Sequence, residues 1–300
     1  MYSLEEFVIA VYCLVDDFLR VLTRNRPLRG RGIDPMFSDS ETLTLLIVGK
    51  FLSLSTDKAI HSFFRRGSWR AWFPCLGCRT TFVRQAANLW RVAQLLQHHL
   101  AQQIGAFHDN VHLIDGLPMT VSCVTRATRT RGFRGQASRG YCASKKLKFY
   151  GFHGHLVVSF EGIITACSVT AANVDEREAA WEVLAGLRGL SLGDKGYLSA
   201  WFQQCLQEET QIKLWTPSRK NMEKQTPRKT QGFFLRVRRR IETVIGQLAE
   251  RFSFERVRAR DRWHLTARVA RKLLSHTASV WIAKRSGLDP LDFDGLLCAE

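Results

Sequence analysis

The sequence predicts an α/β protein in which an all-helical N-terminal region precedes a mixed sheet with helices on both faces. Two observations carry this prediction. Up to about residue 105 the apolar residues recur at the spacing of helix faces, whereas beyond His108 short apolar strands come first and then alternate with helices. The chain has 300 residues, of which 45% are hydrophobic, so it can bury one large core or two smaller ones. We expect a helical region over residues 1–106 and a sheet domain with C-terminal helices over residues 107–300.

The N-terminal region is expected to hold several short helices. Apolar residues in the range 7–22 share one helix face, and the stretch RNRPLRGRGIDP ends that helix. Ser38 and Glu41 have the spacing of a capping box, which predicts a second helix. A long amphipathic helix is expected over residues 80–104. Short arginine-rich helices suit either docking onto DNA ends or a plain supporting role, and both interpretations stay open.

Beyond residue 107 the pattern predicts strands and then alternating helices and strands. A first strand, residues 112–114, ends at Asp115, and a second covers residues 119–125. Two apolar runs flank Glu161 and Gly162 and are expected to form a hairpin. The remaining predicted elements are a helix at 174–187, a strand at 190–192, a helix at 199–209, a strand at 212–215 and a long helix at 233–252.

Two aspartates are expected to face each other in this sheet. Asp115 follows the first strand, Asp194 follows the strand at 190–192, and the two strands are predicted to be central neighbours. Paired carboxylates repel each other unless a cation lies between them, and oxygen ligands without nearby Cys or His favour Mg²⁺ or Mn²⁺. The alternative for Asp194 is ordinary turn chemistry together with Gly196.

A third acidic ligand is expected from the long helix at 233–252. Glu242 borders the apolar stripe of this helix and lies one turn after Arg238. The alternative is an ordinary ion pair on a helix surface. Asp109 and Asp175 are rivals for a place in the site, but Asp109 precedes the first strand and Asp175 has the position of a helix N-cap.

The charge balance indicates a polyanionic partner. Lys and Arg number 44 against 27 Asp and Glu, which gives a formal net charge of +17 and favours nucleic acid over a membrane surface. No Asp or Glu occurs between Gly116 and Phe160, and a phosphate track is expected there from Arg126, Arg129, Arg131, Arg134, Arg139, Lys145, Lys146 and Lys148. The interleaved aromatic residues are expected to offer stacking platforms: Phe133, Tyr141, Phe149 and Tyr150. Further DNA contacts are expected from Lys195, Arg219, Lys220 and Arg238.

Other features narrow the class of protein. The apolar stretch near the N-terminus is interrupted by Asp16 and Asp17, so we expect neither a signal peptide nor a membrane span. The eight cysteines are expected to be reduced thiols. Cys75 and Cys78 have the spacing of half a zinc site, but no second pair matches it. Trp215 is expected either to pack in the core or to stack on an extruded base.

Five blocks of the sequence, in this order, carry a family resemblance: IDGLP (114–118), YCASKKLKFYGFHGHLVVSFEGIITACSVTAANVDERE (141–178), GDKGY (193–197), RRRIETVIGQLAERF (238–252) and FERVRARDRWHLTARVARKLLSHT (254–277). Together they resemble a DDE transposase of bacterial insertion sequences, specifically of the insertion-sequence 982 family, over nearly the whole chain. The resemblance implies a ribonuclease H-like catalytic domain whose DDE triad is Asp115, Asp194 and Glu242. Leu235 and Ala249 stand where a wider transposase signature has a tyrosine and a basic residue, a departure that does not touch the triad.

The resemblance also implies the reaction and its partners. The triad is expected to hold two Mg²⁺ ions, with Mn²⁺ as a substitute, for cleavage and strand transfer at phosphodiesters. The expected partners are double-stranded DNA, at the element ends and at the target, and a second copy of the chain in a homodimer. The expected location is the bacterial cytoplasm, in association with the nucleoid. Two alternatives stay open: a catalytically silent DNA-binding protein descended from a transposase, and a metal-dependent nuclease without strand transfer.

Overall fold

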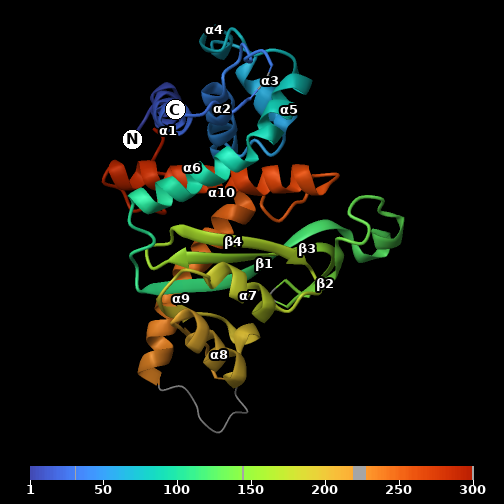
Figure 1. Cartoon of the computed structure of the whole chain (residues 1–300), viewed down its shortest axis with the longest axis vertical. Coiled ribbons are helices and arrows are strands. Elements are labelled where there is room, and N and C mark those ends of the chain that lie inside the picture. Colours follow the sequence, from blue (N-terminus) through green and yellow to red (C-terminus); the bar gives the residue numbers. More distant parts are fainter. Residues whose placement is uncertain (31, 144, 219–227, 299–300) are drawn as a thin grey trace. The chain divides into compact units, whose positions relative to one another are not determined.

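The chain forms two compact units. The computed structural model describes residues 1–30, 32–143, 145–218 and 228–298 (Figure 1). The first unit comprises Met1–Leu100, Leu248–Phe254 and Arg262–Glu300, and the second comprises Ala101–Gln247 and Glu255–Asp261. This division differs from the expected boundary after residue 106, because the C-terminal segment from Arg262 groups with the N-terminal helices and not with the sheet.

The first unit is helical. Its helices are α1 (Leu4–Thr23), α2 (Asp39–Phe51), α3 (Asp57–Phe64), α4 (Trp69–Trp72), α5 (Arg79–Asn88), α6 (Trp90–Gln103) and α10 (Arg262–Arg285), of which α6 runs just past the end of the unit. The expected capping box at Ser38 and Glu41 is present, with the Ser38 hydroxyl accepting from the Glu41 N–H. The single helix expected over 80–104 is two helices, because Leu89 leaves the helical conformation at φ −82°, ψ 10° and buries its side chain.

Helix α10 explains why the C-terminal segment belongs to the first unit. It packs against α2 and α5, and most of its residues between Leu265 and Ala283 are buried. Arg271 on α10 also forms an ion pair with the buried Asp57 on α3, at 2.8 Å. A buried charge is costly without its partner, so this pair ties α10 to the N-terminal helices.

The second unit is built on a mixed sheet. Its strands are β1 (Val111–Cys123), β2 (Ser138–Cys142), β3 (Leu147–Ser159), β4 (Ile164–Ala171), β5 (Gly189–Leu192) and β6 (Ile212–Trp215). They lie in the order β2-β3-β1-β5-β6, and β4 pairs with β3 off this path. Neighbours of β3 are antiparallel to it, whereas β1, β5 and β6 run parallel. The predicted mixed α/β architecture after a helical N-terminal region is confirmed.

The prediction of two strands around Asp115 was wrong, because β1 is continuous. Residues His112 to Thr120 pair with β3 without a break, so Asp115 lies inside the strand, opposite Leu156. Pro118 is tolerated in β1 because β5 pairs only with the strand's first three residues, so position 118 has a paired strand on the β3 side alone.

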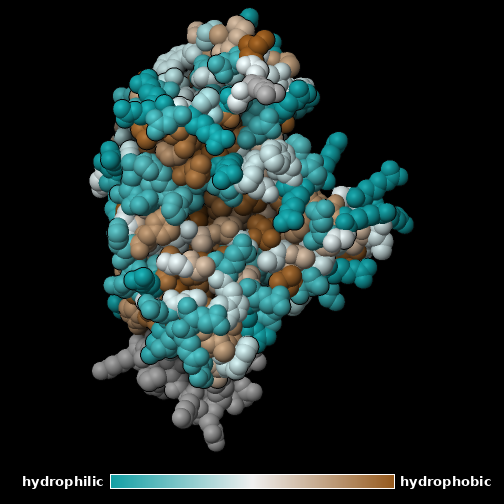
Figure 2. Space-filling model, viewed as in Figure 1, coloured by the Kyte–Doolittle hydropathy of each residue, from teal (hydrophilic) through white to brown (hydrophobic). Residues whose placement is uncertain are grey.

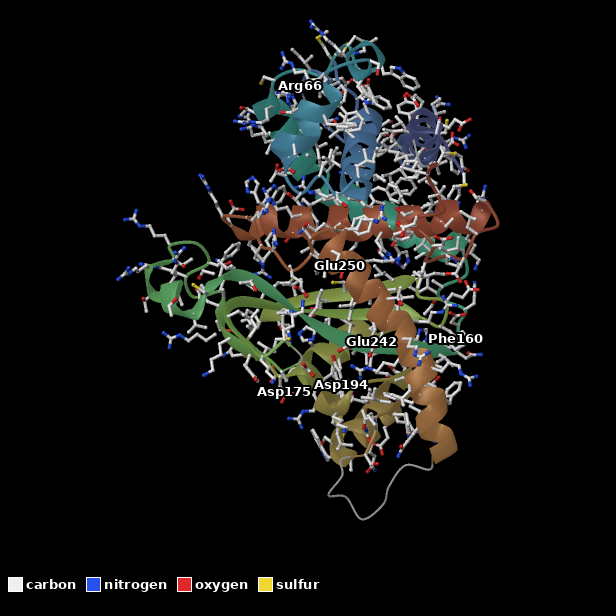
Figure 3. All side chains as sticks on the ribbon, turned by 180° about the vertical axis from the view of Figure 1, so that it is seen from behind. Arg66, Phe160, Asp175, Asp194, Glu242 and Glu250 are labelled. Carbon is white, nitrogen blue, oxygen red and sulfur yellow. The ribbon has the colours of Figure 1, made fainter. Side chains whose placement is uncertain are left out.

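Helices cover both faces of this sheet (Figures 1 and 3). On one face lie α7 (Glu176–Leu184) and α8 (Ala200–Thr210), whose apolar residues share a core with the strands. On the other face α9 (Arg228–Glu250) crosses the sheet and buries its apolar stripe, which includes Phe234, Val237 and Ile241. Asp175 is the N-cap of α7, as its sequence position predicts.

The expectations about a membrane span and about the cysteines can be compared with the structure. In the described part of the chain, no helix is long and apolar enough to cross a membrane. All eight cysteines are free, and Cys75 and Cys78 are both exposed.

Candidate active site

Asp115 and Asp194 lie on adjacent strands. The parallel pairing of β1 with β5 sets Leu113 opposite Leu192, and each aspartate comes two residues later along its chain. Asp115 Oδ1 accepts from the Gly116 N–H at 2.8 Å, and Asp194 Oδ1 accepts from the Gly196 N–H at 2.6 Å. Each carboxylate is therefore held by a backbone amide just beyond the point where β1 and β5 pair.

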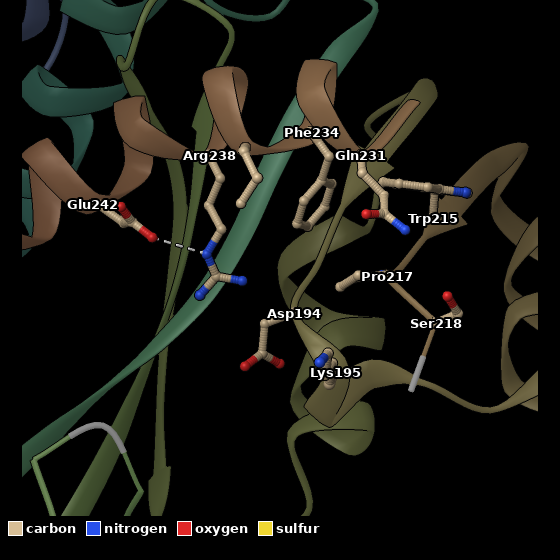
Figure 4. Close-up of a pocket in the computed structure, with 10 residues that line it drawn as sticks. Asp194, Lys195, Trp215, Pro217, Ser218, Gln231, Phe234, Arg238 and Glu242 are labelled. Atoms are coloured by element: carbon tan, nitrogen blue, oxygen red, sulfur yellow. Dashed lines mark hydrogen bonds and ion pairs between the residues drawn. The ribbon is translucent and has the colours of Figure 1, made fainter. Parts of the chain in front are cut away.

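Arg238 joins Asp115 to the acid on α9. Its Nη2 donates to Asp115 Oδ2 at 3.1 Å. Its Nε donates to Glu242 Oε1, also at 3.1 Å, as Figure 4 shows. The spacing of one helical turn that the sequence shows between Arg238 and Glu242 therefore forms an ion pair. That pair is also linked to the sheet, which an ordinary pair on a helix surface would not be.

Burial and like charge act together on Asp115. Its side chain is 17% exposed, against 57% for Glu242. The pKa of Asp115 is raised to about 6: burial is the largest cause, the carboxylates of Asp194 and Glu242 act in the same direction, and Arg238 opposes them. The site thus holds more negative charge than one guanidinium balances, which is the condition that a cation relieves.

A cavity of about 590 Å³ opens beside these groups (Figure 4). Its lining combines the acids with an apolar wall and consists of Asp194, Lys195, Trp215, Pro217, Ser218, Gln231, Phe234, Leu235, Arg238 and Glu242. The rings of Trp215 and Phe234 meet edge to face, with centroids 4.9 Å apart. Trp215 is half-buried and reaches this cavity, so it is not a residue of the closed core.

Glu176 belongs to the same neighbourhood, and the sequence did not single it out. Its pKa is raised to about 7, mainly by burial and then by the charges of Asp194 and Asp115. In the sequence it is an acid in the first turn of a helix, a place that acids commonly take. No spacing signal distinguishes it from Glu178, and only the tertiary structure brings it to the site.

The donor set fits a divalent cation in chemistry and charge. Its side chains offer hard carboxylate oxygens, and its charge balance is negative. Within the described residues, however, no three of the His, Cys, Asp and Glu side chains converge tightly enough to hold one metal ion. Arg238 lies between Asp115 and Glu242, so in this arrangement a guanidinium takes the place between the carboxylates that a metal ion would need.

The predicted phosphate track is exposed. All eight of its basic residues lie on the surface of the segment 124–148, which we call the basic extension, and Figure 2 shows hydrophilic side chains along it. Lys145 pairs with Glu255. Of the expected stacking platforms only Tyr141 is exposed, at 57%. Phe133, Phe149 and Tyr150 are buried, because they pack inward and hold the extension on the sheet.

The other predicted DNA contacts lie in different environments. Lys195 is exposed and lines the cavity next to Asp194. Arg238 is three-quarters buried and engaged with two carboxylates, so its main role in this arrangement is inside the site. Arg219 and Lys220 lie outside the described residues. Figure 3 shows Asp194 and Glu242 on the side of the sheet that α9 crosses.

Comparison with known proteins gives a family and a related structure. A family model described as Transposase DDE domain matches residues 106–262. Among solved structures, the chain is similar to a piggyBac transposase in a synaptic complex with hairpin DNA, with 10% sequence identity and a TM-score of 0.47. That similarity covers 98% of this chain and 78% of the other. No curated protein matches the chain.

Proposed function

The chain belongs to the family of transposases with a DDE domain, whose model matches more than half of it, and on that premise we propose that it cuts and joins DNA at the ends of an insertion sequence. One observation carries the proposal. Carboxylates from three distant parts of the sequence gather around Arg238, which bonds to Asp115 and Glu242 and lines one cavity with Asp194.

The reaction uses water and a DNA hydroxyl as nucleophiles. Water attacks a phosphodiester at the element end and breaks the bond to the 3′ oxygen, which leaves as a free 3′-hydroxyl. That hydroxyl then attacks a phosphodiester of the target, forming a new phosphodiester bond between element and target and breaking the bond to the target's 3′ oxygen, which is released as a 3′-hydroxyl. No protein nucleophile is needed, and the joining step conserves the number of phosphodiester bonds.

The triad supplies the ligands for this chemistry. Asp115, Asp194 and Glu242 are the residues that would hold divalent ions, Mg²⁺ with Mn²⁺ as a substitute. Two such ions, when bound, activate the attacking oxygen and stabilise the leaving one. Arg238 holds Asp115 and Glu242 together and keeps Asp115 ionised against the effect of its burial.

The basic extension and the cavity wall are the proposed DNA contacts. Eight exposed cations without an intervening acid suit a run of backbone phosphates. Lys195, beside Asp194, suits a phosphate close to the cleaved bond. Trp215 and Phe234 give the cavity a flat apolar wall against which a nucleobase can stack.

The proposed transposase family, cellular location and oligomeric state follow the sequence resemblance. We place the chain in the insertion-sequence 982 family of bacteria, acting in the cytoplasm at the nucleoid as a homodimer on paired DNA ends. The strand order β4-β3-β1-β5-β6, with β1, β5 and β6 parallel, supports a ribonuclease H-like classification of the sheet. The helical N-terminal region is the proposed docking element for the DNA ends.

One experiment separates this proposal from its rivals. Purified full-length protein is incubated with labelled duplex that carries the element ends, with unlabelled target DNA and with Mg²⁺. We expect free 3′ ends followed by joined products, and neither in the presence of EDTA. Cleavage without joining would identify a nuclease, and binding without cleavage would identify a silent DNA-binding protein.

A further inference from the structure

A second cavity lies between α5 and the first turn of α10, and the proposed mechanism gives it no role. It has a volume of about 430 Å³, which suits a small ligand. Helices α5 and α10 pack against each other, and both belong to the first unit. None of the residues that line this cavity lines the cavity beside Asp194.

One wall of the cavity is a face of α5 with a polar and an apolar row. Arg84 and Asn88 lie one turn apart in the polar row, and Val83 and Ala87 lie beside them in the apolar row. Arg79 lines the cavity from the first residue of the same helix. The side chains of Arg79, Arg84 and Asn88 are exposed and form no hydrogen bond or ion pair within the described part of the chain. Two guanidinium groups and one amide are therefore available to a ligand.

The opposite wall carries an aromatic ring. Trp263, in the first turn of α10, lines the cavity and is 49% exposed. Trp90, at the start of α6, meets its ring edge to face, with centroids 5.8 Å apart. This contact steadies the Trp263 ring while about half of the side chain stays accessible. Nucleobases stack on aromatic side chains that are held in this way.

The sequence around the cavity is strongly basic. No Asp or Glu occurs between Asp57 and Asp109, whereas six arginines and one lysine do, and none occurs between Asp261 and Asp289. Helices α5, α6 and α10 lie wholly within these two stretches. Accordingly, the described residues that line the cavity include no acid. Arginine side chains without acidic partners suit phosphate, which a guanidinium can bind through two hydrogen bonds.

We propose that this cavity binds an unpaired nucleotide of DNA, with its base stacked on Trp263 and a phosphate held by Arg79 and Arg84. The inference rests on the proposed function, because it takes DNA as the partner. Paired bases stay stacked on one another within a duplex, so only an unpaired or extruded base can use the ring. Asn88 offers an amide donor and acceptor to the edge of that base.

The Trp263 ring is tested by comparing single-stranded with duplex DNA. The full-length protein is titrated against labelled oligo(dT) and against a blunt duplex that carries an element end, and fluorescence anisotropy measures both affinities. We expect Trp263→Ala to weaken oligo(dT) binding roughly fivefold to a hundredfold, the scale of one lost base stack, and to leave duplex binding within about twofold. Trp263→Phe keeps an aromatic ring and should retain most of the affinity. Trp201→Ala, at the exposed tryptophan of α8, is the matched control and should bind as the wild type does.

The salt dependence separates the phosphate contact from the stacking contact. Arg84→Gln should weaken oligo(dT) binding and reduce the slope of log K against log salt by about 0.7, the value for one phosphate of a single strand. Trp263→Ala should leave that slope unchanged, because stacking displaces no counterion. Arg24→Gln, at an exposed arginine that follows α1, is the control for the loss of one charge.

The possible outcomes are distinct. Wild-type oligo(dT) affinity in Trp263→Ala and Arg84→Gln would overturn the nucleotide site, as would a loss that Trp263→Ala shows equally on the duplex. If the wild type binds the duplex but not oligo(dT), the site is also overturned and the proposed function still stands. Failure of the wild type to bind the element-end duplex would overturn the proposed function itself. Circular dichroism of each variant at the titration temperature confirms that a weakened variant is folded.

Discussion

Asp115 is a largely buried carboxyl whose pKa is raised by burial and by its acidic neighbours, against the effect of Arg238. Its pKa of about 6 in the folded chain lies above the value of about 3.9 expected when the chain is unfolded. The folded state therefore binds more protons between those two values, so this carboxyl makes the free energy of unfolding fall as the pH rises through that window.

The pH dependence of stability checks this account of Asp115. In metal-free buffer, Asp115→Asn should gain stability over the wild type as the pH rises from 4 to 7, on the order of 1–3 kcal/mol at the upper end. Urea unfolding at a series of pH values measures the difference. Asp17→Asn, at an exposed acid, is the control. A difference that stays constant with pH would contradict the raised pKa.

Gly196 gives a second test at the scale of one residue. Its φ is not in the left-handed region, so alanine is acceptable to the backbone, and its effect must come through the side chains it meets. The added methyl would overlap Glu176 Oε2 and lie 2.9 Å from Asp194 Oδ1. We expect Gly196→Ala to lower the free energy of unfolding by about 1–3 kcal/mol.

A double-mutant cycle identifies the cause of that loss. Glu176→Ala should relieve the overlap, so the double variant should be more stable than the sum of the two single changes by about 0.5–3 kcal/mol. Gly246→Ala, in α9 where a Cβ meets nothing within 4 Å, should be neutral or stabilising. Additive effects of the two substitutions would show that Glu176 does not lie against Gly196.

Among the elements, the basic extension carries the proposed contact with DNA. Arg126→Gln together with Arg129→Gln should weaken DNA binding and reduce the salt dependence of log K by roughly two. Removing the same charge at the exposed Arg188 and Lys213 is the control and should leave both quantities unchanged. Fluorescence anisotropy at several salt concentrations gives affinity and slope. Equal losses from the two pairs would mean that the extension is not the DNA track.

The elements also show what the sequence can and cannot reveal. Period and capping predicted α2, α7 and β5 well, because these signals are local. The continuity of β1 was missed, because Gly116 and Pro118 are residue types that commonly end a strand. Here pairing with β3 keeps both positions within β1. The link from Arg238 to Glu242 was visible from helical spacing. Its link to Asp115, and the arrival of Glu176, depend on packing between distant segments.

At the scale of the whole molecule, each of the two units is built from segments that are far apart along the chain. The first unit takes its helices from both ends of the chain, and the second is completed by residues 255–261, which pair with β1 at Thr120. A cut between a helical region and a sheet domain at residue 106 therefore divides the first unit.

A fragment of residues 107–300 tests whether α10 needs the N-terminal helices to cover its apolar face. It keeps α10 but removes α2 and α3, so the buried face of α10 is uncovered and Arg271 loses Asp57. Apolar surface of this kind promotes association. We expect the fragment to bind the dye ANS and to elute as aggregates, unlike the full chain. A monomeric fragment with no added dye binding would contradict the assignment of α10 to the first unit.

The central claim is that Asp115, Asp194 and Glu242 act as one catalytic site on DNA. The most direct measurement compares wild type and Asp194→Asn side by side for cleavage of labelled element ends in Mg²⁺ and for binding of the same DNA. The account predicts that the variant binds DNA within a few-fold of the wild type, because a neutral amide adds no repulsion of phosphate, but cuts at least about 10²-fold more slowly. Cleavage by Asp194→Asn at the wild-type rate would contradict it.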